Sequence, residues 1–262
     1  MSRICPLFSG STGNSTFIGT ENYGILIDVG ASCKGIESEL KSAGAELSDI
    51  KAIAITHDHS DHIKGLKTVL KRTGAKLIST EGTLKKLAEK DLIPAFCEVE
   101  AINEKGITLG DSLLNAFSTS HDTLGSCGYT VNFADGKKFS LCTDTGIITD
   151  EIRNAITDSD AVLIESNHDI EMLKKGPYPP ILKVRIMSDN GHISNVVCAG
   201  EVLRLFKNGT TRFILGHLSL NNNTPLIAKR TSESVLFDVG AKNLEDYILS
   251  VANPKGNGVT VI

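Results

Sequence analysis

A cluster of histidines directly after an apolar run constrains this chain more than any other feature. Residues 51–56 read Lys-Ala-Ile-Ala-Ile-Thr, which predicts a short buried strand. Three histidines and a carboxylate follow at once: His57, His59, Asp61 and His62. Imidazole and carboxylate groups are preferred ligands of zinc, manganese and iron, and a single loop can orient several of them together. The cluster therefore predicts a metal site at the end of a strand.

The remaining histidines also lie between predicted elements. Strands predicted over 113–119 and 212–216 lead to His121 and His217, and a hairpin strand over 138–143 leads to Asp144. Asp135-Gly136 supplies the turn of that hairpin. Further metal-ligating side chains are thus expected at the ends of several strands.

Strands and helices alternate along the chain. An apolar strand over 23–30 carries Asp28 near its end, and a helix is predicted from Ser32 to Gly44. Further strands are predicted over 75–79 and 161–165. Further helices are predicted from Ile63 to Gly74 and over 81–90, 149–159, 180–187 and 194–207. This order predicts an α/β protein with two sheets packed face to face.

The His-x-His-x-Asp-His run, with Asp28, His121, Asp144 and His217 in that order, resembles the five motifs of the metallo-β-lactamase superfamily. The resemblance covers nearly the whole chain. It implies a four-layer αββα sandwich, with two mixed β-sheets flanked by helices, in one domain over 1–262. It also implies a binuclear site. His57, His59 and His121 would bind one cation, Asp61, His62 and His217 would bind the other, and Asp144 would bridge them. Asp28 would support the metal loop by hydrogen bonding.

Further stretches, over 9–15, 165–169, 191–195 and 216–219, resemble the bacterial YycJ/WalJ group. This group is related to the RNase Z, RNase J and β-CASP nucleases and is regarded as acting on DNA from the 5′ end. The resemblance implies a metal-dependent phosphodiesterase, a 5′-to-3′ DNA exonuclease whose nucleophile is a hydroxide between two cations. The stretch from Asp144 to His217 is too short to hold an inserted β-CASP domain.

Other polar residues are candidates for catalysis or substrate binding. Asp61 is a catalytic candidate, and His192 is expected to donate a proton to the leaving oxygen. His168 is a catalytic candidate, although a hydrogen bond to a ligand or direct contact with a metal would fit it equally well. Phosphate oxygens could be bound by the Gly- and Ser-rich loop and by a basic stretch of the chain. The residues predicted to bind substrate in this way are Ser11, Asn14, Lys183 and Arg185. A turn and a solvated helix face are the alternatives.

The composition says more about the location of the protein than about its substrate. The net charge of −4 argues against broad electrostatic binding to nucleic acid, and the six cysteines form no Cys-x-x-Cys pair. No apolar run reaches the roughly 18 residues that span a bilayer, so we expect a cytoplasmic protein without a membrane partner. The expected cofactors are two divalent cations, zinc or manganese, with iron also suitable. DNA is the expected substrate, and no protein partner can be inferred.

Two other functions are consistent with the same ligands. One is a small-molecule thioester or lactone hydrolase similar to glyoxalase II, which would share most of the metal site. The other is a nucleic-acid-binding module with a structural metal. A closed structural site fills every coordination position of its ion, whereas a carboxylate between two ions leaves room for water.

Overall fold

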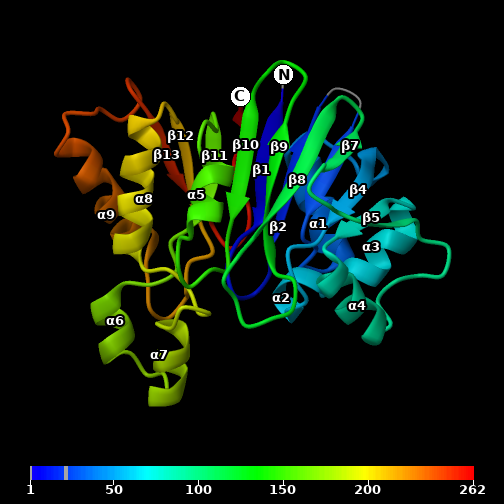
Figure 1. The fold of residues 1–262 in the computed structure, drawn as a ribbon, viewed down its shortest axis with the longest axis horizontal. Helices are drawn as coiled ribbons and strands as arrows, with labels where there is room; N and C mark the ends of the chain where they lie inside the picture. The colour runs from blue at the N-terminus through cyan, green and yellow to red at the C-terminus, as the bar shows by residue number, and fades with distance from the viewer. Residues whose placement is uncertain (1, 21–22) are drawn as a thin grey trace.

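Two β-sheets lie face to face in the centre of the molecule, with helices on both outer sides (Figure 1). The computed structural model describes residues 2–20 and 23–262. Within these residues, the first sheet has seven strands in the order β14-β1-β2-β3-β4-β5-β6. Its strands are β1 (Arg3–Phe8), β2 (Ser15–Gly19), β3 (Gly24–Ile27), β4 (Ile50–Ala54), β5 (Lys76–Ser79), β6 (Val99–Ala101) and β14 (Thr260–Val261).

The second sheet also has seven strands in the described part of the chain, in the order β13-β12-β11-β10-β9-β8-β7. Its strands are β7 (Ile107–Leu109), β8 (Ser112–Ser118), β9 (Cys127–Asn132), β10 (Lys138–Cys142), β11 (Ala161–Glu165), β12 (Arg212–Gly216) and β13 (Ile248–Val251). Each sheet is mixed, with antiparallel pairs at one side and parallel pairs from β3 to β6 and from β10 to β13. The expected αββα sandwich is confirmed.

Helices cover the outer faces of both sheets. On the first sheet and its connections lie α1 (Cys33–Ser42), the 3₁₀ turn η1 (Leu47–Asp49), α2 (Ser60–Ile63), α3 (Leu66–Thr73) and α4 (Glu81–Glu89). The second half carries α5 (Asp150–Ile156), α6 (Ile170–Lys175), α7 (Pro180–Ile186), α8 (Asn195–Lys207) and α9 (Pro225–Phe237). None of the helices that the structure describes combines the length and apolar character needed to cross a bilayer.

Alternation along the strands divides the core into three layers. In β3, Ile25 and Ile27 pack between the sheets, whereas Leu26 faces the helices of the first half. In β11, Leu163 lies between the sheets and Val162 faces the helices of the second half. Successive side chains of a strand point to opposite faces, so strands that are apolar throughout are buried on both sides.

The helix predicted from Ile63 to Gly74 is present as α3, but it begins at Leu66, and Ile63 belongs to the separate short helix α2. The Gly65 N–H donates to Val29 O at 2.8 Å instead of continuing the ladder of α2. A Cβ atom at Gly65 would lie 2.1 Å from Ala31 O, so the break depends on a glycine. It brings the turn after β3 against the loop that carries the histidines.

Candidate metal centre and active site

The predicted metal-ligating residues lie at one edge of the sandwich, where strands of both sheets end. His57 and His59 follow β4, and α2 carries Asp61 and His62. The ends of β8, β10 and β12 lead to His121, Asp144 and His217. In Figure 1, α2, α6 and α7 lie at this edge.

The backbone is left-handed at three of these strand ends. The φ angles are 63° at Asp28, 56° at Asp144 and 54° at His217. Such angles are uncommon outside glycine, and they concentrate at functional sites because the surrounding structure must hold them. Here each one turns a polar side chain from the end of a strand into the same space.

The structure brings all seven predicted ligands together. Their ligand atoms fall into overlapping groups whose members lie within 4.8 Å of one another. The groups are His57 with His59 and His121; His57 with His62 and Asp144; Asp61 with His62 and His217; and Asp144 with Glu165, His192 and His217. Four residues, His57, His62, Asp144 and His217, each belong to two of these groups, so the groups form one continuous cluster, and Asp144 is the carboxylate among the four.

Several ligand atoms are buried without a hydrogen-bond partner. They are His57 Nε2, Asp144 Oδ2 and His217 Nε2. A buried polar atom that makes no hydrogen bond costs free energy, unless an ion or water pairs with it. Imidazole nitrogens and carboxylate oxygens are the donors that divalent transition metals accept. The residues present thus fit divalent metal binding.

The ionisation of the cluster is consistent with a site for positive charge. Burial alone would lower the pKa of His62, but the carboxylates of Asp28 and Asp144 outweigh it and raise that pKa to about 10. Burial, with the imidazoles of neighbouring histidines, holds the pKa of His57 well below its usual value. Burial would raise the pKa of Asp144, yet His217 and the other imidazoles hold it well below the usual range. Cations would take the place of these protons, so metal binding should release protons.

Asp28 fixes the orientation of the histidine loop. Its carboxylate accepts hydrogen bonds from Thr56 N at 2.8 Å and from Thr56 Oγ1. It also lies 2.8 Å from His62 Nδ1. An imidazole that donates Nδ1–H to a carboxylate keeps its Nε2 lone pair for a metal. The structure thus places Asp28 in contact with Thr56 and His62 of the histidine loop.

We expect Asp28→Asn to weaken metal binding about 10- to 100-fold, because an outer partner of a ligand would lose its charge. Asparagine tolerates the left-handed backbone, so the change tests the carboxylate itself. A competition titration against a chromophoric chelator measures the affinity. Asp91→Asn is the matched control, since Asp91 has a φ of 52° and lies exposed far from the ligands in sequence. Equal affinities for the two variants would contradict this role.

Asn14 also contacts the ligands. The Gly10 N–H donates to Asn14 Oδ1 at 2.8 Å, which turns the amide nitrogen toward the site. That nitrogen lies 3.2 Å from Asp61 Oδ2 and 3.0 Å from His62 Nε2. The structure therefore places Asn14 against two of the predicted metal ligands, while Ser11 of the same loop lines the cavity above them.

Glu165 has a central place that the sequence did not reveal. It ends β11, is fully buried, and its Oε1 accepts from Nδ1 of both His192 and His217 at 2.8 Å. Burial would raise its pKa, but the two histidines lower it to about 2. A carboxylate at the end of an apolar strand, next to a histidine, was the available signal. The candidate predicted from this stretch was His168 instead.

The two remaining histidines, His168 and His192, differ in their position relative to the cluster. A cavity of about 230 Å³ lies over the ligands His59, Asp61, Asp144 and His217, and His192 lines it. His168 lies in an adjoining hollow that His192 also lines. His168 is buried, its Nδ1 has no hydrogen-bond partner, and burial lowers its pKa. The structure thus brings His192, and not His168, into the cavity above the cluster.

The predicted basic residues also differ in position. Arg185 on α7 lines the cavity, and its Nε and Nη2 each lie 2.6 Å from Asp122 Oδ2. The other oxygen of Asp122 lies 3.4 Å from His59 Nε2. Lys183 donates instead to Lys174 O at 2.7 Å and does not belong to the lining described for the cavity. Of the two residues, Arg185 is the one placed to meet a substrate at this site.

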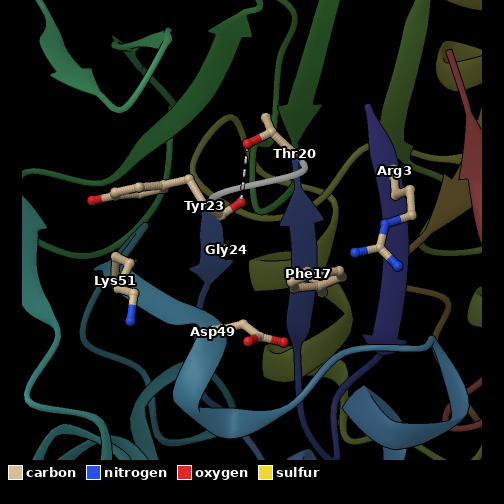
Figure 2. A pocket seen from close by; sticks show the side chains of 7 residues that line it. All are labelled: Arg3, Phe17, Thr20, Tyr23, Gly24, Asp49 and Lys51. Carbon is tan, nitrogen blue, oxygen red and sulfur yellow. Dashed lines mark hydrogen bonds between the residues drawn. The ribbon is translucent and has the colours of Figure 1, made fainter. Parts of the chain in front are cut away.

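Another hollow lies near the opposite end of β4. Figure 2 shows its lining, which includes Arg3, Tyr23, Asp49 and Lys51. Asp49 and Lys51 lie at the start of β4, whereas His57 follows its end. None of the residues lining this hollow belongs to a potential metal-binding group among the described residues. It is therefore separate from the candidate active site.

Comparisons with known proteins agree with this fold. Residues 23–218 match the model of the beta-lactamase superfamily domain, which covers most of the chain. The chain therefore belongs to the metallo-β-lactamase superfamily, and it is an enzyme of the hydrolase type. The resemblance seen in its motifs is confirmed.

Two curated sequence relatives show which proteins within the superfamily this chain is similar to. The chain is 33% identical over 257 residues to exodeoxyribonuclease YycJ of Bacillus anthracis, and this alignment covers 95% of the chain and 94% of that protein. It is 39% identical over 228 residues to exodeoxyribonuclease WalJ of Streptococcus pneumoniae, covering 86% of this chain and 84% of the relative. Zn²⁺-bound PqqB of Methylobacterium extorquens has the same fold, with a TM-score of 0.72, 16% identity and complete coverage of both chains.

Proposed function

We propose that this protein is a metal-dependent DNA exonuclease that degrades strands from 5′ to 3′. The observation that carries the proposal is the similarity, over nearly the whole chain, to a protein named exodeoxyribonuclease. The site supports it, because a cluster of imidazoles and carboxylates lies beneath an open cavity with an arginine in its wall. Phosphodiesters need compensation of negative charge and an activated water, and such a cluster can supply both when loaded.

Two divalent cations, zinc or manganese, would be held at this site. His57, His59 and His121 would hold one, Asp61, His62 and His217 would hold the other, and Asp144 would contact both. When bound, such a pair would lower the pKa of water to about 7 and offset the charge of the phosphate. Iron would fit the same donors.

The chain's own residues would orient water, substrate and leaving group. Asp61 lines the cavity, and burial, which would raise its pKa, is outweighed by the imidazoles of His217 and His62, which lie 3.7 and 3.5 Å from its Oδ2 and lower that pKa. The ionised carboxylate can accept a hydrogen bond from the attacking water. Glu165 holds His192 by Nδ1, which leaves Nε2 to deliver a proton to the leaving oxygen. Ser11 and Arg185 would bind phosphate oxygens.

We further infer that residues 1–262 act as one domain. The layer between the sheets joins side chains of both halves, including Ile27 of the first sheet and Tyr129 of the second. The ligands likewise come from both halves. Neither half would have a complete site or a covered core alone.

Metal removal should abolish DNA hydrolysis, and reloading should restore it. Purified protein is stripped with a chelator, loaded separately with zinc and manganese, and given 5′-labelled and 3′-labelled single-stranded and double-stranded DNA. We expect turnover only with loaded protein and early release of the 5′ label. Thioester and lactone substrates are assayed in parallel. Rapid cleavage of a thioester or lactone with intact DNA would replace the proposal by a small-molecule hydrolase.

A further inference from the structure

The cavity above the ligand cluster is lined by two chemically different sets of residues. One set consists of the predicted ligands and His192, which suit a phosphate group. The other set comes from α7 and the loop before it and includes Tyr178, Leu182 and Ile186, which we call the apolar wall. A phosphate group alone would gain no favourable contact from apolar side chains. A nucleotide brings both a charged phosphate and a flat heteroaromatic base.

Tyr178 is the aromatic side chain in this lining, among the residues that the structure describes. It is half-buried, and Asn221 Nδ2 donates to its hydroxyl at 3.0 Å. That hydrogen bond holds the ring from a segment that follows β12. Aromatic rings stack on nucleobases without needing a particular sequence, because every base has a flat face.

The position of this wall is coupled to the metal cluster. Arg185 of α7 is paired with Asp122, and Asp122 lies within 3.6 Å of His121 Nε2. Leu182 and Ile186 come from the same short helix as Arg185. The pair therefore ties the apolar wall to residues that border the reacting centre, so a base on the wall would lie beside a phosphate over the cluster.

We infer that Tyr178, with Leu182 and Ile186, forms a subsite for the nucleobase adjacent to the scissile phosphate. This inference rests on the proposed nuclease function and adds a specificity-determining group to it. The subsite would accept any base, since its contacts are stacking and apolar contacts, with no hydrogen-bond pattern to read. It would disfavour a sugar that carries no base.

A substrate and protein cycle tests the subsite. Single-stranded oligonucleotides carry either normal nucleotides or abasic residues at the first two positions of the 5′ end, with a second set altered at the 3′ end. For the end that is attacked, wild-type kcat/KM should be about tenfold higher with the bases present. Tyr178→Ala should lower kcat/KM about tenfold on the normal strand and leave the abasic strand within about twofold, because the lost contact is absent there already.

Matched variants separate stacking from folding. Tyr178→Phe keeps the ring and should stay within about threefold of wild type, whereas Tyr178→Leu keeps apolar bulk without the aromatic face and should resemble Tyr178→Ala. Ile181→Ala is the control on α7, since Ile181 is 82% exposed and does not belong to the described lining. It should leave both substrates unchanged.

The outcomes of these experiments test the base subsite separately from the proposed nuclease function. Equal cleavage of normal and abasic strands by wild type would overturn the subsite and leave the nuclease function standing. Equal loss on both strands in Tyr178→Ala and Tyr178→Leu would also overturn it. Failure of loaded wild-type protein to cleave any DNA would overturn the proposed function, and the subsite with it.

Discussion

Asp144→Asn should lower the rate of DNA hydrolysis by about 10³-fold or more, because the Asp144 carboxylate lies at the centre of the cluster of predicted ligands. Asp144 Oδ1 lies 3.5 Å from His217 Nε2, and Oδ2 lies 3.4 Å from His62 Nε2. Oδ2 is buried and has no hydrogen-bond partner. Asparagine keeps the shape but removes the charge and one acceptor, so neighbouring cations would no longer share an anionic ligand.

The substitution isolates the charge because asparagine tolerates a left-handed backbone. Metal content by mass spectrometry and turnover on labelled DNA give the two measurements, and both should fall. Asp158→Asn is the control: Asp158 has a φ of 61°, is exposed, and belongs to none of the potential metal groups found among the described residues. Wild-type turnover in Asp144→Asn would remove the basis of the proposed site.

Glu165→Gln should lower kcat by about 10²-fold, through the two histidines that Glu165 orients. Oε1 accepts from His192 and His217, while Oε2 lies 3.3 Å from both Thr145 N and Ile193 N. Both oxygens therefore accept, and an amide nitrogen at either position would face donors. The variant loses either the histidine pair or two backbone hydrogen bonds, and it loses the negative charge beside His192 and His217.

Steady-state kinetics on DNA, with metal content measured in the same samples, check this prediction. We expect kcat to fall much more than metal content, since the groups around the histidine loop remain. Glu201→Gln is the matched control, because Glu201 is also buried and pairs with Arg204 at 2.6 Å in α8. It should alter stability and leave kcat near wild type. A kcat for Glu165→Gln equal to that of Glu201→Gln would assign Glu165 a structural role only.

Much of the fold could be predicted because hydrophobic periodicity records burial. β4, β11 and β12 are mostly apolar, and each was predicted to within two residues at either end. The hairpin of β9 and β10 followed from Asp135-Gly136, and Gly136 has a φ of 82°. Such signals are local, so a single sequence contains them.

Other elements were missed where the local signal is weak. No helix was predicted at α9, although Thr224 accepts from Ile227 N as its N-cap and Pro225 opens its first turn. Its buried face consists of Ala228, Ser232 and Leu236, which gives little contrast with the exposed face. The edge strands β13 and β14 are short and half-exposed, so alternation within them is hard to recognise.

In the candidate site too, residues with a local sequence signal were predicted, whereas contacts between distant residues were not. The ligands were predicted because histidines and acids follow strands, which is visible in the order of residues. The role of Glu165 was missed because it depends on His192 and His217 meeting one carboxylate in space. Asn14 was predicted to bind phosphate, whereas its contact with Asp61 depends on how residues 10–14 fold back on the histidine loop. Long-range pairing of this kind has no signature in one sequence.

The origin of the ligands in both sheets has a consequence for the lifetime of the protein. Cations bound by ligands from both halves, such as His57 and His217, would cross-link the two halves of the sandwich. A ligand that binds only the folded chain shifts the balance away from open forms by mass action. The supply of metal in the surroundings would then set how quickly proteases clear the protein, as well as how fast it works.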